Sequence, residues 1–305
     1  MSPVVSVVIP VFNRADLVGT AIQSVLDQTG VPLEILLVDD ASTDDLSATV
    51  ARFPGAPLTV IRHVQNGGAA VARNTGIARA RGAWVAFLDS DDIWLPGKLE
   101  QQLAFLTARG LAGGCTDYYI RRALDRDEVE ERHLAYRDEL TLKDLVWGCY
   151  VSPGATLMVR RDVWAEIGPL DPAYRRFEDW DWLMRFTRRH ALGMLGRPLA
   201  CVRFSARPAR QQVMEGLARL QSHHGDLLAR EAPALARRFR AGVAMERAAM
   251  AFHDHRPIAA AWNVLCSLAL VPISNLAFAK VVAPRMRGAA YGGGRPRVVL
   301  PGSSS

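Results

Sequence analysis

The sequence has few cysteines and lacks the paired motifs in which cysteine binds zinc. Four are present, Cys115, Cys149, Cys201 and Cys266, and no CxxC occurs. This spacing excludes a zinc ribbon and a dense disulfide framework, so we expect small buried apolar side chains in a reducing compartment. The motifs GxGxxG, GxxxxGK[ST], GxSxG and HExxH are also missing. Their absence argues against a Rossmann dehydrogenase, a P-loop NTPase, an α/β-hydrolase and a zinc protease.

The composition carries no sign of a fibrous, repetitive or disordered chain. No Gly-X-Y period, heptad run or repeat of about 20 to 50 residues is present. Half of the residues are hydrophobic and 22% are charged. A chain of 305 residues with this balance folds around a sizeable core, as one large domain or two smaller ones.

Basic residues outnumber acidic ones by 37 to 31, which gives a net charge of +6. Such a chain suits anionic partners such as nucleotides, nucleic acids or membrane surfaces. Lysine and arginine are not interleaved with aromatic residues as in RNA-binding proteins, so we expect no nucleic-acid partner. The first residues lack the parts of a secretory signal, which predicts a cytoplasmic protein, with the inner face of a membrane as a further candidate location.

Short apolar runs alternate with amphipathic segments over the first 90 residues. This alternation is typical of βαβ units with a parallel sheet, so we expect a doubly wound α/β fold. Ligands of such sheets bind beyond the carboxyl ends of the strands. The predicted strands are 4–11, 34–38, 58–62 and 84–88, and the predicted helices are 15–28, 44–53 and 67–80, with Ser42 or Thr43 capping the second helix.

The pattern changes after residue 113. Further strands are predicted at 113–121, 155–159 and 192–204, helices at 161–167 and 178–190, and a charged loop at 122–139. From Pro208 to Arg287 the spacing is helical, and the remainder is rich in Gly, Pro and Ser. We therefore expect three parts: an α/β domain at 1–205, a helical region at 206–287 that serves an acceptor, an oligomer contact or a membrane surface, and a flexible tail at 288–305.

Asp89 and Asp91 follow the fourth predicted strand and flank Ser90. In extended chain, residues two apart point to the same side, so both carboxylates can face one ligand. Two close carboxylates repel unless a cation or a shared proton lies between them, and Mg²⁺ or Mn²⁺ with substrate phosphates is the common solution. The structural alternative is that these aspartates cap the helix that starts near Pro96.

Two other polar clusters follow predicted strands. Asp39 and Asp40 could accept hydrogen bonds from a base or a ribose, or form an Asx-turn before the next helix. Arg73 lies one turn into the helix that opens at Gly67 and Gly68, where it could reach a phosphate or a base, or stay solvated on the surface.

Acidic and aromatic residues alternate between Phe177 and Trp182. A carboxylate in a partly apolar wall has a raised pKa and is a better general base. The structural alternative is an acidic helix N-terminus that complements the helix dipole, with the tryptophans in the core.

Taken in order, these blocks resemble family-2 glycosyltransferases of the GT-A fold. The resemblance covers residues 4 to 205 and includes all four N-terminal blocks with the usual spacing. It rests on VSVVIPVFNR at 5–14, EILLVDDASTD at 34–44, Asn66 to Asn74, FLDSDD at 87–92, and Glu178-Asp179-Trp180.

The resemblance implies a nucleotide-diphosphate sugar, with UDP favoured, bound across the α/β domain. It also implies that Asp179 is the general base of an inverting transfer and that Asp91, with Asp89, binds Mn²⁺ or Mg²⁺. The residues that it places against the donor are Pro10, Val11, Phe12, Asn13, Asp39, Asp40, Gly68, Arg73, Asp89 and Ser90. The Gln-x-x-Arg-Trp motif of processive synthases does not follow Trp182, so we expect a non-processive enzyme of the hexosyltransferase type, acting in cell-surface polysaccharide biosynthesis.

Residues 258–279 form a mostly apolar segment. Three interpretations stay open: an amphipathic helix packed on the protein, an interfacial helix with basic flanks such as Arg256 and Lys280, and a membrane span.

The predicted acceptor is a hydroxyl of a glycan, of a lipid-linked sugar or of a small molecule, and a homodimer is a further candidate assembly. The alternative functions are a non-catalytic nucleotide-sugar-binding protein and a receiver-like regulatory domain, because an acidic pair at a strand end also suits a phosphoacceptor.

Overall fold

The computed structural model describes residues 3–121, 129–132, 137–203 and 209–271. The contacts within the chain divide these residues into two compact units. One unit contains the described residues up to 141 and those from 150 to 203, and the other contains 142–149 and 209–271. The helical region therefore includes a short segment that the predicted boundary at residue 205 assigns to the α/β domain.

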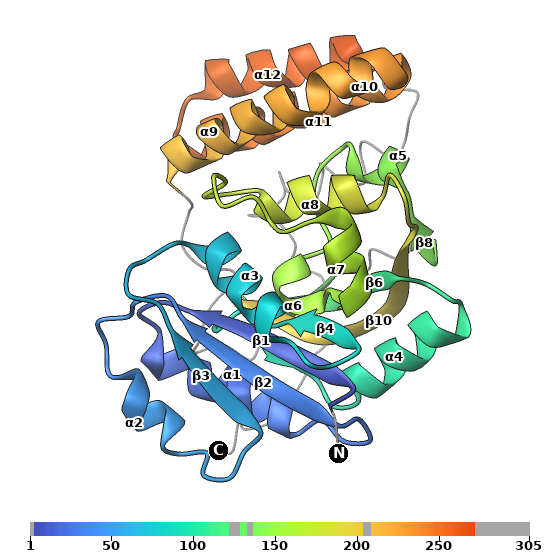
Figure 1. The fold of residues 1–305 in the computed structure, drawn as a ribbon. Coiled ribbons are helices and arrows are strands. Elements are labelled where there is room, and N and C mark those ends of the chain that lie inside the picture. Colours follow the sequence, from blue (N-terminus) through green and yellow to red (C-terminus); the bar gives the residue numbers. More distant parts are fainter. Residues whose placement is uncertain (1–2, 122–128, 133–136, 204–208, 272–305) are drawn as a thin grey trace. The chain divides into compact units, whose positions relative to one another are not determined.

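The first unit is built on one mixed sheet of ten strands (Figure 1). The order is β3-β2-β1-β4-β9-β6-β10-β5, with β7 beside β6 and β8 beside β10. The strands are β1 (Val5–Val11), β2 (Leu33–Asp39), β3 (Leu58–Arg62), β4 (Trp84–Phe87), β5 (Ile93–Trp94), β6 (Gly113–Arg121), β7 (Val129–Arg132), β8 (Glu139–Leu140), β9 (Met158–Arg160) and β10 (Leu192–Arg203).

The helices of this unit connect the strands and pack on the sheet. They are α1 (Ala15–Leu26), α2 (Leu46–Val50), α3 (Ala69–Arg79), α4 (Lys98–Ala108), α6 (Pro153–Thr156), α7 (Arg161–Ile167) and α8 (Glu178–Phe186). The second unit contains α5 (Leu142–Leu145), α9 (Arg210–Leu220), the π-helix η1 (Gln221–Gly225), α10 (Asp226–Glu231), α11 (Pro233–His253) and α12 (Pro257–Leu270).

The four strands β3, β2, β1 and β4 are parallel, as the alternation of strands and helices predicts. β1 is buried along nearly its whole length because helices cover both faces of the sheet. Val5, Val7 and Ile9 belong to the core formed with α1, whereas Val8 faces Gly76 of α3 on the other side. This layering brings the carboxyl ends of β1, β2 and β4 to the same edge of the sheet.

Three local predictions are wrong. Asp45, and neither Ser42 nor Thr43, caps α2, because its carboxylate accepts from the amide of Ala48. The predicted loop at 122–139 contains β7, which pairs with β6, and β8 begins at its last residue. The predicted strand at 155–159 begins only at Met158, since a short helix that starts at a proline precedes it.

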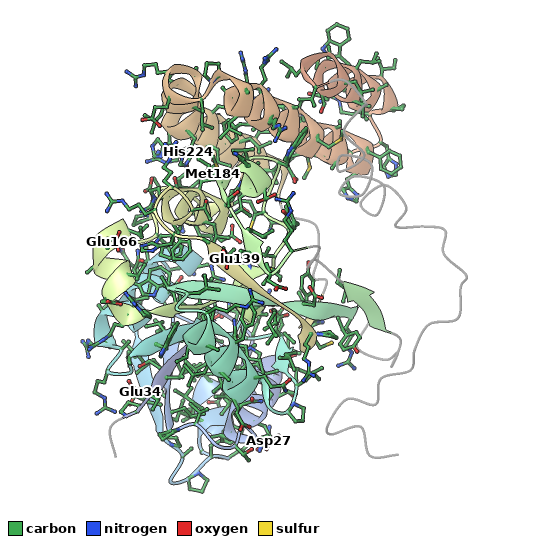
Figure 2. The ribbon with its side chains drawn as sticks, turned by 90° about the vertical axis from the view of Figure 1, so that its right-hand side faces the viewer. Asp27, Glu34, Glu139, Glu166, Met184 and His224 are labelled. Carbon is green, nitrogen blue, oxygen red and sulfur yellow. The ribbon has the colours of Figure 1, made fainter. Side chains whose placement is uncertain are left out.

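The amino-terminal ends of β1 and β2 are joined by a buried polar cluster. Glu34, labelled in Figure 2, accepts from the Ser6 hydroxyl at 2.6 Å and from the amide and the side chain of Arg81. Burial raises the pKa of Glu34, but these hydrogen bonds outweigh it and hold that pKa below its ordinary value. The cluster stabilises the sheet at these strand starts, whereas ligands of such sheets bind at the carboxyl ends.

The predicted apolar segment 258–279 lies partly in α12, and its residues 272–279 lie outside the described part of the chain. Among the described residues, no helix has both the length and the apolarity needed to cross a membrane.

Lys98, the first residue of α4, is buried completely. Its ammonium nitrogen lies 3.8 Å from the ring centroid of Trp94 and has no hydrogen-bond partner among the described residues. Burial lowers the pKa of Lys98 to about 7. The unfolded chain keeps this proton until the pH approaches 10.5, so the folded state binds fewer protons than the unfolded state between these two values. The contribution of Lys98 to the free energy of unfolding therefore increases as the pH rises from about 7 to 10.5.

We predict that Lys98→Met increases the free energy of unfolding, on the order of a few kcal/mol at pH 6, because it removes a buried charge while keeping the volume. The gain should shrink as the pH rises from 7 towards 10. Urea unfolding of both proteins at pH 6, 7.5 and 9 measures this difference. A loss of stability that is the same at all three pH values would contradict it.

Candidate functional site

The loop after β1 is tied to the loop after β2. The Asn13 side chain accepts from the amide of Thr43 at 2.7 Å, and the amide of Asn13 donates to the Ser42 hydroxyl at 3.1 Å. Asn13 has a positive φ of 50°, which asparagine tolerates better than most residues. In the same segment Pro10 and Val11 belong to the strand, and Phe12 is 44% exposed just beyond its end. The predicted donor segment 10–13 thus contains one exposed aromatic ring.

Asp39 and Asp40 at the end of β2 are both buried, and each has a structural role. Asp39 accepts from the amide of Ser42, which matches the Asx-turn alternative, and pairs with Arg62 at 3.0 Å. Arg62 also donates to the carbonyl of Ser42. Asp39 therefore shapes the loop that carries Ser42.

Asp40 organises the start of α3. Its carboxylate accepts from the amides of Gly67 and Gly68, at 2.9 and 2.7 Å, and contacts the His63 ring at 2.7 Å. The other ring nitrogen of His63 lies 2.9 Å from the hydroxyl of Thr75. The carboxylate oxygens of Asp40, expected to face a base, thus hold the loop that begins α3.

Arg73 on α3 joins two acidic motifs that are far apart in the sequence. One terminal nitrogen of its guanidinium lies 2.6 Å from Asp89, and the other lies 2.8 Å from Glu178. The side chain is 7% exposed, so the surface-arginine alternative is wrong. Burial favours the neutral form, but the two carboxylates raise the pKa of Arg73 overall.

This bridge brings the end of β4 and the start of α8 to one place. The Glu178 side chain is 13% exposed, and its burial together with the neighbouring Asp179 raises its pKa, with Arg73 opposing the shift. Trp180 and Trp182 belong to the core, as the structural alternative for this segment expects. The raised pKa expected from the apolar wall is thus found at Glu178.

Asp179 lines a small cavity together with Arg73. The other walls are mostly apolar and include Trp164 and Trp182, whose rings stack at 4.0 Å. One carboxylate oxygen of Asp179 accepts from the amide of Trp180 at 2.7 Å. Asp179 therefore lies next to the Arg73 bridge and lines a small, partly open pocket.

Asp91 pairs with Arg14, the residue that precedes α1, at 2.6 Å. Burial raises the pKa of Asp91, and Asp89 adds to the effect while Arg14 opposes it. Burial and these two aspartates also raise the pKa of Asp92, which accepts from the amide of Arg203. The raised pKa values of Asp91 and Asp92 indicate that these two carboxylates are only partly neutralised by the surrounding cations.

The aspartates after β4 do not cap the following helix. The residue before α4 is Gly97, and no side chain caps that end. Ser90, between the two candidate metal ligands, is buried. The capping alternative is therefore wrong, and another role is needed for the acidic cluster.

Gly154 in α6 makes the close approach to Asp89 possible. Its carbonyl accepts from the amide of Asp89 at 2.7 Å, and a Cβ at this position would lie 2.2 Å from the Asp89 carboxylate. Any larger residue would push this carboxylate away from its place beside Arg73. No sequence motif around Gly154 could have indicated this role.

The donor set fits a hard divalent cation. Asp89 and Asp91 carry carboxylate oxygens, which are the ligands that Mg²⁺ and Mn²⁺ prefer, and the pKa of Asp91 is raised by its burial and by the neighbouring Asp89. Among the described residues, no three His, Cys, Asp or Glu side chains converge on a single metal position. A metal at this site would therefore need oxygens from a ligand, as Mg²⁺ usually does with substrate phosphates.

Sequence reasoning missed four residues of this arrangement: Arg14, His63, Gly154 and Glu178 in its pairing with Arg73. Arg14 was visible only as a polar residue at a strand end. His63 lies 23 residues from Asp40 and Glu178 lies 105 residues from Arg73, and Gly154 is likewise far along the chain from Asp89, so local spacing hid these pairings.

The comparison with known families is decisive. The family model described as Glycosyl transferase family 2 matches residues 6–168, more than half of the chain. The chain belongs to this family. Membership confirms the resemblance and the expectation of a glycosyltransferase, and it removes the receiver-like alternative.

Curated relatives are similar in sequence to this chain over part of their length. The putative teichuronic acid biosynthesis glycosyltransferase TuaG of Bacillus subtilis is 37% identical over 171 residues, which are 54% of this chain and 65% of TuaG. The Escherichia coli enzyme named UDP-Glc:alpha-D-GlcNAc-diphosphoundecaprenol beta-1,3-glucosyltransferase WfaP is 34% identical over 118 residues, 39% of this chain and 47% of WfaP. The chain thus spans less than two thirds of these relatives.

Solved structures share the fold at low identity. TarS 1-349 of S. aureus, in complex with UDP-GlcNAc, has a TM-score of 0.58 at 16% identity, over 85% of this chain and 89% of TarS. The mannosyltransferase PcManGT of Pyrobaculum calidifontis, in complex with GDP-Man and Mn²⁺, has a TM-score of 0.53 at 18% identity, over 94% of this chain and 81% of PcManGT. The GT-A architecture is confirmed.

The Arg73 bridge generates a prediction about stability. Arg73→Gln should lower the free energy of unfolding by about 3 to 5 kcal/mol, because it leaves Glu178 buried without its cation. Glu178→Gln in the same chain should recover part of the loss, since a neutral amide needs no counter-charge.

A double-mutant cycle in urea measures the coupling between the two positions. Arg160→Gln is the control, because Arg160 pairs with Asp162 in an exposed site and its loss should change the free energy of unfolding by less than about 1 kcal/mol. Additive losses for Arg73→Gln and Glu178→Gln would show that the two side chains do not stabilise each other.

Proposed function

We propose that the chain is a metal-dependent, inverting and non-processive glycosyltransferase that moves a sugar from a UDP-sugar to an acceptor hydroxyl. The observation that carries the proposal is the Arg73 bridge. It holds Asp89, in the acidic cluster that suits a diphosphate and its metal, beside Glu178 and hence next to Asp179, the candidate base. In a displacement reaction the base and the leaving group must lie on opposite sides of the same sugar.

The donor class is supported by the relatives. WfaP is named for UDP-Glc, and TarS was solved with UDP-GlcNAc, although PcManGT was solved with GDP-Man. In the proposed complex the nucleotide lies against residues 10–13, with the exposed ring of Phe12 available to stack on the base. Gly68 and Ser90 are further donor contacts in this proposal.

Three residues that the resemblance places against the donor, Asp39, Asp40 and Arg73, have an indirect role in this proposal. Asp39 and Asp40 shape the loops around the nucleotide, since their oxygens already accept from backbone amides. Arg73 acts on the donor through Asp89, because its terminal nitrogens are engaged with carboxylates. In this proposal all three are positioning residues.

Asp91 and Asp89 would hold Mn²⁺ or Mg²⁺, with diphosphate oxygens completing the shell. The ion would stabilise the negative charge that develops on the leaving nucleoside diphosphate. Arg14 now neutralises Asp91, and its half-exposed side chain can leave that carboxylate and turn to the diphosphate. Both positions of Arg14 place a positive charge beside the acidic cluster.

Asp179 is the proposed general base. Its carboxylate takes the proton of the acceptor hydroxyl while that oxygen forms a bond to C1 of the sugar. The bond from C1 to the diphosphate oxygen breaks on the opposite face, so the anomeric configuration inverts. Arg73 and the mostly apolar walls of the cavity hold the carboxylate in a partly dehydrated place.

A lipid-linked sugar is the acceptor that the relatives favour. WfaP and WfgD of Escherichia coli are both named for a diphosphoundecaprenol-linked acceptor, and TuaG for teichuronic acid biosynthesis. These names support a role in cell-surface polysaccharide synthesis, and a cytoplasmic location at the inner face of a membrane stays a prediction. Pairing as a homodimer stays a prediction.

Asp179→Asn should slow transfer strongly and keep donor binding. We expect the turnover number to fall by about 10²- to 10⁴-fold, because the amide cannot accept the proton, while the donor dissociation constant stays unchanged. Release of nucleoside diphosphate and calorimetric titration of the donor measure the two quantities.

The matched control is Asp162→Asn, which makes the same change at an exposed aspartate of α7 and should leave both quantities unchanged. Normal turnover in Asp179→Asn would remove Asp179 as the base. Donor binding without turnover in the unaltered chain, across a panel of lipid-linked and soluble acceptors, would favour the non-catalytic alternative.

Asp91→Asn should remove the metal-dependent part of donor binding. A panel of nucleotide sugars with and without Mn²⁺ is read by thermal shift. A ligand at 100 times its dissociation constant stabilises a folded protein by about 2.7 kcal/mol, which is a shift of several degrees. In the unaltered chain and in Asp162→Asn, we expect one class of nucleotide sugar to raise the unfolding temperature by this amount, and only when Mn²⁺ is present. An equal metal-dependent shift in Asp91→Asn would contradict the assignment.

A further inference from the structure

The outward face of α12 is apolar. Ile258, Trp262 and Leu265 recur at helical spacing and are 85%, 66% and 59% exposed. Ala261 and Ala269 are also exposed on this helix. Large apolar side chains that gather on one exposed surface mark an interaction site, whereas single ones are ordinary.

The polar side chains of α12 are directed inward. Ser267 is completely buried and donates to the carbonyl of Ala241 in α11 at 2.9 Å. Asn263 is half-buried and donates to the carbonyl of Ala259 one turn earlier. A helix that faces water has the reverse arrangement, with its apolar residues inside. The pattern of α12 fits a neighbour that is itself apolar.

Arginines flank the apolar face at both ends. Arg256 is exposed and directly precedes α12. Arg237 is exposed on α11, one turn before Ala241, where the carboxyl-terminal part of α12 packs. α12 contains no charged residue, and Asp254 near its start pairs with Arg210 at 3.0 Å. Between residues 209 and 271 there are eight arginines and five acidic residues.

We propose that α12 lies in the interface of an anionic phospholipid bilayer, with Trp262 and Leu265 among the acyl chains and Arg237 and Arg256 at the lipid phosphates. Tryptophan is enriched at the boundary between acyl chains and headgroups. Helices with one apolar face and basic flanks bind in this orientation, parallel to the membrane plane. The surface would bring the protein to a membrane whether or not the proposed transfer reaction is correct.

A second copy of the chain is a less suitable partner for the apolar face of α12. A symmetric pair formed by two antiparallel α12 helices would place Arg256 of one copy near Arg237 of the other. Like charges at an interface oppose association, whereas anionic lipids neutralise them. The charge pattern therefore favours the bilayer.

The experiment is sedimentation of the full chain with vesicles of phosphatidylcholine containing 30% phosphatidylglycerol. We expect binding to these vesicles, and at least about tenfold weaker binding to vesicles of phosphatidylcholine alone. The variant Trp262→Ser/Leu265→Ser should weaken binding by about tenfold or more, since it removes the largest inserted side chains. Arg237→Gln/Arg256→Gln should weaken binding to the anionic vesicles by about tenfold and reduce its salt dependence.

Val60→Ser/Val64→Ser is the matched control. It also removes two exposed apolar side chains, 43% and 102% exposed, but from β3 and the loop after it. Binding should be unchanged, and thermal unfolding should show that all variants are folded.

Failure of the unaltered chain to bind, or unchanged binding in the α12 variant, would overturn the proposal. So would a dimer that the α12 variant converts to a monomer in a protein that does not bind vesicles. The readout contains no transfer step, so its outcome is separate from that of the catalytic variants.

Discussion

The candidate site depends on one ion-pair arrangement, in which the guanidinium of Arg73 lies between Asp89 and Glu178. The three residues come from α3, from the end of β4 and from the start of α8. The side chains of Arg73 and Glu178 are 7% and 13% exposed and that of Asp89 is 35% exposed, so removing Arg73 leaves Glu178 in a largely buried place without its cation. This constraint ties the acidic cluster after β4 to the segment that carries Asp179. It also requires a glycine at position 154, because a Cβ there would lie 2.2 Å from the Asp89 carboxylate.

Around this bridge, polar contacts connect the ends of the parallel strands in sequence. Asp91 pairs with Arg14, Asn13 next to it bonds to the loop after β2, and Asp40 at the end of β2 holds the residues that begin α3. Several side chains that a family resemblance assigns to the ligand are thus engaged with the protein itself. In the proposed complex they shape the donor region, and exposed groups such as Phe12 make the direct contacts.

The two units have different surface chemistry. The α/β unit gathers carboxylates at one edge of its sheet, and the helical unit presents an apolar face bordered by arginines. A sugar donor with a diphosphate and a lipid-linked acceptor require these two kinds of surface, one for a metal and phosphates and one for a bilayer. The division of the chain therefore agrees with the proposed function.

The sequence alone determined the elements whose signal is local. The buried strands, the helices between them and the aspartates at the strand ends follow from periodicity and from motif order, and these sufficed to predict the fold class and the family. The tertiary structure decided the partner of each charged side chain. Arg73 is no surface residue, Asp40 bonds to backbone amides, and Glu178 has the raised pKa. These outcomes depend on contacts between segments up to 105 residues apart, which burial and long-range packing establish and local spacing does not encode.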